Sequence, residues 1–392
     1  MKVLMFHSDY RQPGGETKSV HAEVAHLRRR GLEVELAQLE ALSNVGVVDA
    51  VDKVLTGRRA FVDGLATIRG FRPDVIHIQN IWPGWGHGLL RAVSESGIPW
   101  VQTLRNYRWT CLSANHFRAG KACFDCTQSS TAVAGLRHGC YRGSKAASTA
   151  LMLHDANIRA IRKRRPNGAP RSVIVLSESM RDYFTSASSE NLNFRVKYNC
   201  LEDEPRPLPV QQRNGLVCIG RLEREKGFDL AIAGWCALTQ KPRLHIVGDG
   251  ELAPLAQQVQ REHPELVTWH PQLPHHDTLN LLASSSLSIN LPRWQEPFGR
   301  VALESIALGV PVVHSGRGAL SEVVGPGGWA AALHRGDVAD VLQRALIDAE
   351  WKSADAREHY LANFSADATT RQLHKIYVEA ISDADSLRMD AR

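Results

Sequence analysis

Residues 294–313 read WQEPFGRVALESIALGVPVV, and this stretch indicates more about the fold than any other part of the chain. Pro297 has a fixed φ that suits a first helical turn, and residues 299–308 are mostly helix formers. Gly309 can adopt the left-handed conformation that ends a helix, and residues 310–313 form an apolar run typical of a buried strand. The stretch therefore predicts a loop, a helix that begins near Pro297, and a strand.

Two glutamates, Glu296 and Glu304, lie on either side of the predicted helix start. The amides of Phe298 and Gly299 fall where helix N–H groups lack partners, and a glycine lets an anion approach the backbone closely. Together these residues predict a pocket for a ligand with hydroxyls at both ends and an anion between them. Simpler alternatives remain open, because Glu304 could form only an ion pair with Arg300, and Glu296 only a helix cap.

The composition is that of a soluble globular protein with more than one domain. The chain has 392 residues, 43% hydrophobic and 22% charged, and this length is too great for one ordinary core. No apolar run reaches membrane-spanning length, and His7 and Asp9 interrupt the N-terminal strand too early for a signal peptide. We therefore expect a cytoplasmic protein.

The net charge of +6 is unevenly distributed. Residues 1–200 carry +12 and residues 201–392 carry −6, so the two halves are expected to meet different partners. A basic helix end at residues 159–165 leaves open a peripheral contact with anionic lipid at the inner membrane face. A solvated helix face is the alternative. No nucleic-acid partner is expected.

Apolar strands alternate with helical segments in both halves of the chain. Strands are predicted at residues 2–6, 32–39, 73–78, 99–104 and 172–176, and then at 215–220, 244–247, 267–270, 287–290 and 310–314. A proline-rich segment, residues 202–214, separates the two series. This alternation predicts an α/β fold with doubly wound parallel sheets. The domains are expected at residues 1–200 and 201–365, with a late helix at about 366–392.

Ligands of such sheets bind beyond the carboxyl ends of the strands, so the residues there are candidate site residues. Gly14 and Gly15 could receive a phosphate at a helix N-terminus, although a glycine pair is more often a turn. Arg105 could stabilise a phosphate or a leaving group, with a solvated or ion-paired arginine as the alternative. Arg221 and Lys226 flank the turn after the strand at 215–220 and could bind a diphosphate, unless both lie on the surface.

Residues 248–253 match the GxGxxA form of a dinucleotide-binding fingerprint. Asp249 and Glu251 would repel a pyrophosphate at that turn, so we discount the match.

Four of the seven cysteines lie within thirty residues: Cys111, Cys123, Cys126 and Cys140. A Cys-x-x-Cys pair with two flanking cysteines could hold a structural zinc or another thiolate-bound metal. Four reduced cysteines without a metal are an equal alternative, because disulfides are disfavoured in a reducing cytosol.

Several of these motifs resemble those of a known family. They are Gly14-Gly15-Glu16, Gly220-Arg221 followed by Lys226-Gly227, the VGDGE turn at residues 247–251, and Glu296-Pro297-Phe298-Gly299 with Glu304 eight residues after the first glutamate. On these residues the chain resembles the retaining glycosyltransferases of family 4, part of glycosyltransferase group 1. The resemblance extends from residue 3 to about residue 345.

The resemblance implies the GT-B fold, in which two Rossmann-like domains face each other across a cleft and a C-terminal helix crosses back to the first domain. It places the acceptor on the side of the N-terminal domain and the nucleotide-sugar donor in the C-terminal domain. The residues that it implies for donor binding are Arg221 and Lys226 for the diphosphate, with the amides of Phe298 and Gly299; Glu304 for the ribose; and Glu296 for the sugar.

The implied reaction moves a hexose-type sugar from a UDP- or GDP-linked donor to a hydroxyl of a glycan, a lipid-linked or a small-molecule acceptor, without a cofactor or bound divalent ion. The chain departs from the family at Arg105 and Gln79, where the family often has histidine. A nucleotide-sugar epimerase, a dinucleotide-binding oxidoreductase and a non-catalytic binding module are the alternatives.

Overall fold

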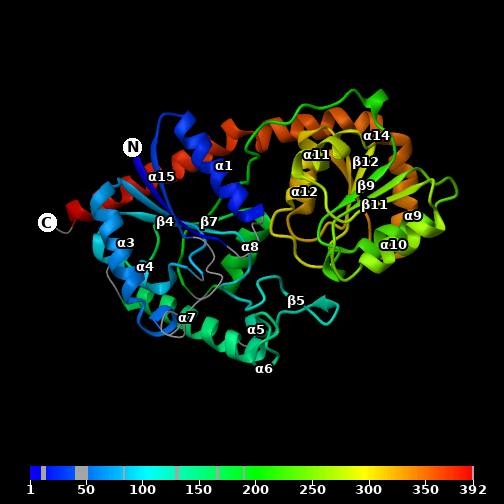
Figure 1. Cartoon of the computed structure of the whole chain (residues 1–392). Helices are drawn as coiled ribbons and strands as arrows, with labels where there is room; N and C mark the ends of the chain where they lie inside the picture. Colours follow the sequence, from blue (N-terminus) through cyan, green and yellow to red (C-terminus); the bar gives the residue numbers. More distant parts are fainter. Residues whose placement is uncertain are drawn as a thin grey trace. The chain divides into compact units, whose positions relative to one another are not determined.

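The computed structural model describes residues 1–9, 15–39, 52–82, 84–128, 132–164, 167–188 and 190–390, without the side chains of Lys53 and of residues 385–390. The chain divides into two compact units (Figure 1). The first comprises Met1–Asn115, Phe124–Glu202 and Thr369–Arg392, and the second comprises His116–Cys123 and Asp203–Ala368.

The first unit is built on a parallel sheet of six strands in the order β2-β1-β3-β4-β7-β8. Its central strands are completely buried because helices cover both faces. The strands are β1 (Lys2–Ser8), β2 (Glu33–Leu39), β3 (Val75–Ile78), β4 (Trp100–Leu104), β7 (Ser172–Val175) and β8 (Phe194–Val196). The sequence did not predict β8, which is a three-residue, half-buried edge strand with little apolar signal.

Alternate residues of these strands pack into two layers of helices. The helices of this unit are α1 (Gly15–Arg29), η1 (Asp52–Thr56), α3 (Arg58–Phe71), α4 (Gly86–Ser96), α5 (Asp125–Gln128), α6 (Val133–Arg137), α7 (Lys145–Arg164) and α8 (Glu178–Ala187). One face of the sheet packs against α3, α4 and α7 through Leu4, Phe6, Ile76 and Trp100. The other face packs against α1 and the C-terminal helix through Val3 and Met5.

The C-terminal helix α15 (Ala366–Asp390) completes the core of the first unit. Its apolar residues Leu373, Ile376, Tyr377 and Ala380 recur at helical spacing and join the cluster around β1 and α1. The chain thus begins and ends in the same unit.

The second unit contains another parallel sheet, in the order β11-β10-β9-β12-β13-β14. In chain order this is the arrangement 3-2-1-4-5-6 of a classical dinucleotide-binding fold, in which the strand order reverses between β9 and β12. The strands are β9 (Leu216–Ile219), β10 (Leu244–Val247), β11 (Val267–His270), β12 (Leu287–Asn290), β13 (Val312–His314) and β14 (Gly328–Ala330). A separate two-stranded hairpin, β5 (Phe117–Arg118) and β6 (Lys121–Ala122), is also assigned to this unit.

Helices cover both faces of the second sheet, among them the long α14 along one face (Figure 1). The helical elements are η2 (Val210–Gln212), η3 (Arg224–Lys226), α9 (Phe228–Cys236), α10 (Ala253–Glu262), α11 (His275–Ala283), α12 (Arg300–Ala307), α13 (Leu320–Val324), η4 (Gly325–Gly327) and α14 (Arg335–Asn363). Within the described residues, no helix has both the length and the apolar sequence needed to cross a bilayer.

The predicted start of helix α12 is wrong by three residues. The helix begins at Arg300 rather than near Pro297, and Gly299 precedes it with φ of 92°. A Cβ at Gly299 would lie 2.6 Å from the Leu320 side chain, so only glycine fits this turn. The predicted end is confirmed, because Gly309 follows the helix with φ of 63°.

Candidate functional site

A pocket opens in the second unit where the strand order reverses. Its volume is about 130 Å³, less than the roughly 300 to 1,000 Å³ of a typical ligand pocket, so it suits one part of a larger ligand. The lining comes from the end of β9, the turn into α9, the end of β12 and the start of α12: Cys218, Ile219, Gly220, Lys226, Gly227, Phe228, Ala231, Ile289, Asn290, Leu291, Glu296, Gly299, Arg300 and Val301.

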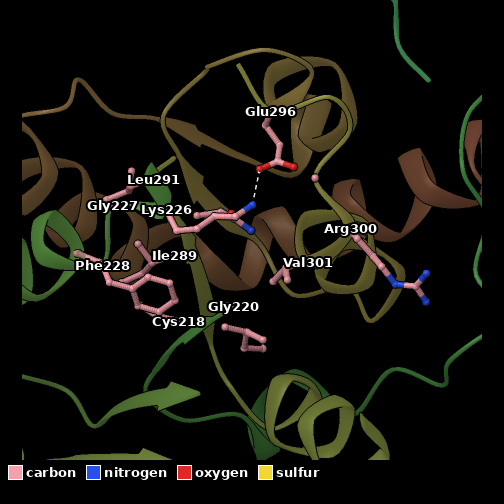
Figure 2. Close-up of a pocket in the computed structure, with 14 residues that line it drawn as sticks. Cys218, Gly220, Lys226, Gly227, Phe228, Ile289, Leu291, Glu296, Arg300 and Val301 are labelled. Carbon is pink, nitrogen blue, oxygen red and sulfur yellow. Dashed lines mark hydrogen bonds and ion pairs between the residues drawn. The ribbon is translucent and has the colours of Figure 1, made fainter. Parts of the chain in front are cut away.

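The structure brings together Lys226 and Glu296, two of the predicted site residues. Their side chains point toward each other in Figure 2, with Nζ and Oε2 2.8 Å apart. The Lys226 ammonium also lies 4.8 Å from the centre of the Trp294 ring, which is a favourable cation–π distance. The Lys226 side chain keeps 23% of its exposure. An anionic ligand can therefore still reach the ammonium group.

A close backbone contact fixes the turn that carries Lys226. Gly227 has φ of 71°, and a Cβ there would lie 1.9 Å from the carbonyl oxygen of Leu291. Glycine thus lets the turn after β9 rest against the chain leaving β12. This contact explains why two loops about seventy residues apart present one pair of side chains.

Arg293 holds the same two loops together. Its backbone N–H donates to the Glu225 carbonyl at 2.7 Å, and its guanidinium binds both carboxylate oxygens of Asp229 at 2.7 Å. Such a bidentate pair has a fixed geometry. Sequence reasoning missed Arg293 and Asp229, because neither belongs to a local motif and they are 64 residues apart.

Arg221, the other predicted diphosphate ligand, lies on the same turn but does not line the pocket. Its side chain is 69% exposed, with a nitrogen 3.6 Å from the Glu225 carboxylate. Such an exposed pair is weak. The side chain is therefore available to an anionic ligand at little energetic cost.

The N-terminus of α12 also contributes to the pocket, through Gly299, Arg300 and Val301. A helix N-terminus carries partial positive charge and favours anions. The Phe298 side chain is buried and packs edge-on against Phe364 at 5.9 Å between ring centres. The backbone at Gly318 packs closely against the backbone of Glu296, because a Cβ at Gly318 would lie 2.2 Å from the Glu296 carbonyl oxygen.

Glu304 lies inside α12, as the sequence predicted, and its side chain is buried. Its Oε1 accepts a hydrogen bond from Arg300 Nε at 3.0 Å, and His275 Nε2 lies 3.8 Å away. The ion pair that was the simpler alternative is therefore present. Glu304 does not itself line the pocket, whereas its partner Arg300 does.

The turn at residues 248–253 packs against its neighbouring loop. A Cβ at Gly248 would lie 1.9 Å from the carbonyl oxygen of Gly220, and one at Gly250 would lie 2.9 Å from the Leu222 backbone. The Leu222 N–H donates to the Asp249 carbonyl at 2.9 Å. These glycines thus serve loop packing, which supports the decision to discount a dinucleotide fingerprint here.

Arg105 lies in a buried polar network of the first unit, so the ion pair that was the alternative is present. Its three guanidinium nitrogens donate to Glu23 Oε1 at 2.9 Å, Gln79 Oε1 at 3.1 Å and Asn199 Oδ1 at 2.8 Å. Lys197 Nζ also binds Glu23 Oε1 at 2.5 Å. Each guanidinium nitrogen thus has a protein acceptor, and Arg105 also lines the small hollow at the ends of β3 and β4. The sequence could not show that α1 places the Glu23 side chain against the end of β4.

The network extends to His77 and Tyr377. His77 Nδ1 lies 2.6 Å from the Tyr377 hydroxyl, and its Nε2 lies 2.7 Å from Thr103 Oγ1. Burial lowers the pKa of His77 to about 3. Burial alone would raise the pKa of Glu23, but the charges of Arg105 and Lys197 outweigh it and hold that pKa below its usual value. The network therefore ties α15 to the first sheet with a neutral histidine and an ionised carboxylate.

The predicted glycine pair is only partly described. Gly14 lies outside the described residues, whereas Gly15 is the first residue of α1. Glu16 lines a small hollow at the ends of β3 and β4, and burial raises the pKa of its carboxyl group. Gly15 is thus at the helix N-terminus that the sequence predicted.

The metal site that was one of the two alternatives for the four clustered cysteines is not seen in the described residues. None of the seven cysteines forms a disulfide, and the described residues contain no group of three or more His, Cys, Asp or Glu placed to hold a metal ion. Cys140 packs against the cluster of Trp82 and Leu112, whereas Cys111 Sγ lies 3.1 Å from Ser113 Oγ.

Comparison with known proteins finds a family match in the second unit. The model of the glycosyl transferases group 1 family matches residues 202–361, which include the whole pocket. The second unit is therefore similar to this family, and the predicted resemblance is confirmed. It is similar to glycogen synthase of Mycobacterium tuberculosis, at 31% identity over 228 residues that cover 53% of this chain and 54% of that protein. The chain thus aligns with about half the length of this curated relative.

Solved structures share the fold over nearly the whole chain. Sucrose-phosphate synthase from Thermosynechococcus elongatus has a TM-score of 0.65 at 16% identity and covers 97% of this chain and 99% of its own. HepE of Anabaena, solved in complex with UDP-glucose, has a TM-score of 0.63 at 18% identity and covers 98% and 100%. The prediction of a GT-B fold with two Rossmann-like domains is confirmed.

Proposed function

We propose that the protein is a retaining glycosyltransferase that moves a sugar from a nucleoside diphosphate donor to a hydroxyl of an acceptor. One observation carries the proposal: the residues of the group 1 glycosyltransferase match enclose a pocket in which Lys226 and Glu296 are paired at 2.8 Å beside the N-terminus of α12. A pocket with a reachable ammonium group and a helix N-terminus suits a diphosphate. Its volume of about 130 Å³ fits that part of the donor alone.

The donor would lie with its diphosphate against Lys226, the start of α12 and the exposed Arg221. Glu296, which already accepts a hydrogen bond from Lys226, would also accept hydrogen bonds from hydroxyls of the sugar. Glu304 would bind the ribose hydroxyls while Arg300 holds its carboxylate. The charges of Lys226 and Arg221 and the N-terminus of α12 would stabilise the diphosphate as negative charge develops on it. Such electrostatic stabilisation is usually the largest single contribution to catalysis.

In the proposed reaction, the bond between the anomeric carbon and the phosphate oxygen breaks, and its electron pair leaves with the diphosphate. The acceptor oxygen attacks from the same face and forms the new glycosidic bond. Its proton passes to an oxygen of the departing phosphate. No side-chain nucleophile is required, so retention follows from the shared face of departure and attack.

The acceptor would bind to the first unit and would be a glycan, a lipid-linked or a small-molecule hydroxyl compound. The donor base would be uracil or guanine, and UDP is the first to test because HepE, a protein of the same fold, was solved with UDP-glucose.

The test offers the full chain a panel of UDP- and GDP-linked sugars and measures release of the nucleoside diphosphate. We expect one donor to be consumed. The Glu304→Ala variant should weaken nucleotide binding, and Glu296→Gln should mainly lower turnover. Glu265→Gln is the matched control, since Glu265 is exposed and does not line the pocket. Unchanged sugar transfer in both site variants would refute the assignment. An altered sugar nucleotide without acceptor would favour an epimerase instead.

A further inference from the structure

A larger hollow lies in the first unit and has no role in the proposed donor chemistry. Its volume is about 380 Å³, within the range of ordinary ligand pockets. It is formed by α7, the segment that follows β4, and the end of α8. The aromatic part of its lining includes Trp109 and Phe184.

The hollow carries an excess of positive charge. Four cationic side chains and two carboxylates line it: Arg108, Arg159, Arg162, Lys163, Asp155 and Glu190. Glu190 binds Arg162, with Oε2 3.1 Å from Nε, and Asp155 lies 3.2 Å from His154. The charges that line this space therefore favour an anion.

Arg162 is the most constrained of these cations. Its side chain is only 6% exposed, and its guanidinium lies 4.1 Å from the centre of the Trp109 ring. Its Nη1 is buried and makes no hydrogen bond within the described residues. A buried donor of this kind is costly unless a further group satisfies it. The planar fork of a guanidinium matches an oxyanion.

The hollow adjoins the edge of the first sheet where ligands are expected. A smaller space of about 60 Å³ lies at the carboxyl ends of β3 and β4, and Arg108, Trp109 and Asp155 line both spaces. In open α/β sheets, ligands bind beyond the carboxyl ends of the strands. A molecule held by its anionic group in the larger hollow can therefore extend to this edge.

We propose that this hollow binds an oxyanion, a phosphate or carboxylate group, of the acceptor, with Arg159, Arg162 and Lys163 as its ligands. The assignment of the bound molecule as an acceptor rests on the proposed function, whereas the existence of the anion site does not. The acceptor is then an anionic hydroxyl compound rather than a neutral sugar.

Binding is tested on the full chain by titration calorimetry with glucose 6-phosphate, glucuronate, inorganic phosphate and glucose. We expect the three anions to bind and glucose to bind at least about tenfold more weakly. The Arg159→Ala/Lys163→Ala double variant removes two exposed cations without disturbing the core. It should weaken anion binding by about tenfold or more. Arg164→Ala is the control, because Arg164 lies on the same helix but does not line the hollow.

The Arg162→Lys variant tests the buried member of the set. It keeps the charge but loses the fork, so it should weaken phosphate binding while the protein remains folded. Equal anion affinity in wild type, the double variant and Arg162→Lys would overturn the proposal. So would equal binding of glucose and glucose 6-phosphate.

A sedimentation experiment with vesicles of phosphatidylglycerol in phosphatidylcholine distinguishes a lipid headgroup from a soluble acceptor as the source of the oxyanion. If the wild type and Arg164→Ala sediment with these vesicles and the double variant does not, the oxyanion belongs to a lipid headgroup. Soluble anion binding without such sedimentation assigns it to a soluble acceptor. Titration with UDP and GDP runs in parallel: if neither binds, the proposed donor function fails while the anion result remains interpretable.

Discussion

Replacement of Lys226 by methionine tests the proposed donor site most directly. Methionine keeps most of the apolar stem and removes the ammonium group that lies 2.8 Å from Glu296 and 4.8 Å from the Trp294 ring. The ammonium group is the one side-chain cation paired to Glu296 among the described contacts, so its loss leaves the carboxylate to repel an incoming diphosphate.

The size of the effect follows from the contacts. A hydrogen bond to a charged group contributes about 1.5 to 3 kcal/mol, so its loss should raise the dissociation constant for a nucleoside diphosphate roughly 10- to 150-fold. The free energy of unfolding should change by about 1 kcal/mol or less, because the side chains keep 23% and 11% of their exposure and such pairs stabilise weakly. Weakened binding would then not be a consequence of unfolding.

The assay is calorimetric titration of wild type and Lys226→Met with UDP and GDP at one fixed ionic strength, since salt screens partly exposed charges. Lys241→Met is the matched control, because Lys241 Nζ only donates to the Leu238 carbonyl at 2.9 Å and does not line the pocket. If wild type and Lys226→Met bind the same nucleotide with equal affinity, the placement of the diphosphate is wrong.

Three further predictions concern the backbone and the buried network. Gly227→Ala should weaken nucleoside diphosphate binding at least about tenfold in the same titration, because its φ is 71° and the new Cβ would meet the Leu291 carbonyl; unchanged affinity would contradict this. Glu23→Gln should lower the free energy of unfolding by about 3 to 5 kcal/mol at pH 7, since Arg105 loses its buried carboxylate, and a urea-measured loss below about 1 kcal/mol would be too small. The free energy of unfolding should also decrease as the pH is lowered, because His77 has a lowered pKa of about 3. The stability that the neutral His77 contributes is complete above pH 6.5 and is lost as the pH falls toward 3. The lowered pKa of Glu23 acts in the same direction below its usual value of 4.5. Urea midpoints that match at pH 7.5 and pH 5 would refute the titration argument. His77→Gln should make the change in stability between these pH values smaller, and the remainder would come from other buried histidines with lowered pKa values, such as His7 and His314.

Most of the fold could be predicted from the sequence because parallel strands are short, continuous apolar runs. Strands β10, β11 and β12 have the bounds that the sequence predicted. The apolar spacing of Leu373, Ile376 and Tyr377 likewise identified a packed helix. The strands β8 and β14 were missed because each has three residues, none of them fully buried.

The proposed donor pocket could also be largely predicted from the sequence. Lys226 and Glu296 each belong to a loop that follows a strand, and strands of one parallel sheet bring such loops to one edge. Local sequence could not show that Gly227 and Leu291 make the contact that brings the two loops together. It also could not show Arg293, whose partner Asp229 is far away along the chain.

The sequence by itself thus determined most of the elements, the family resemblance and the residues at the strand ends, because these depend on local spacing and composition. Only the tertiary structure decided the state of each charged group. Arg105 and Lys226 both follow strands, yet Arg105 is buried against Glu23 while Lys226 remains within reach of a ligand. The physical reason is that a side chain's burial and partners come from elements distant in the sequence, here α1 for Arg105 and the loop before α12 for Lys226. No local pattern records those partners.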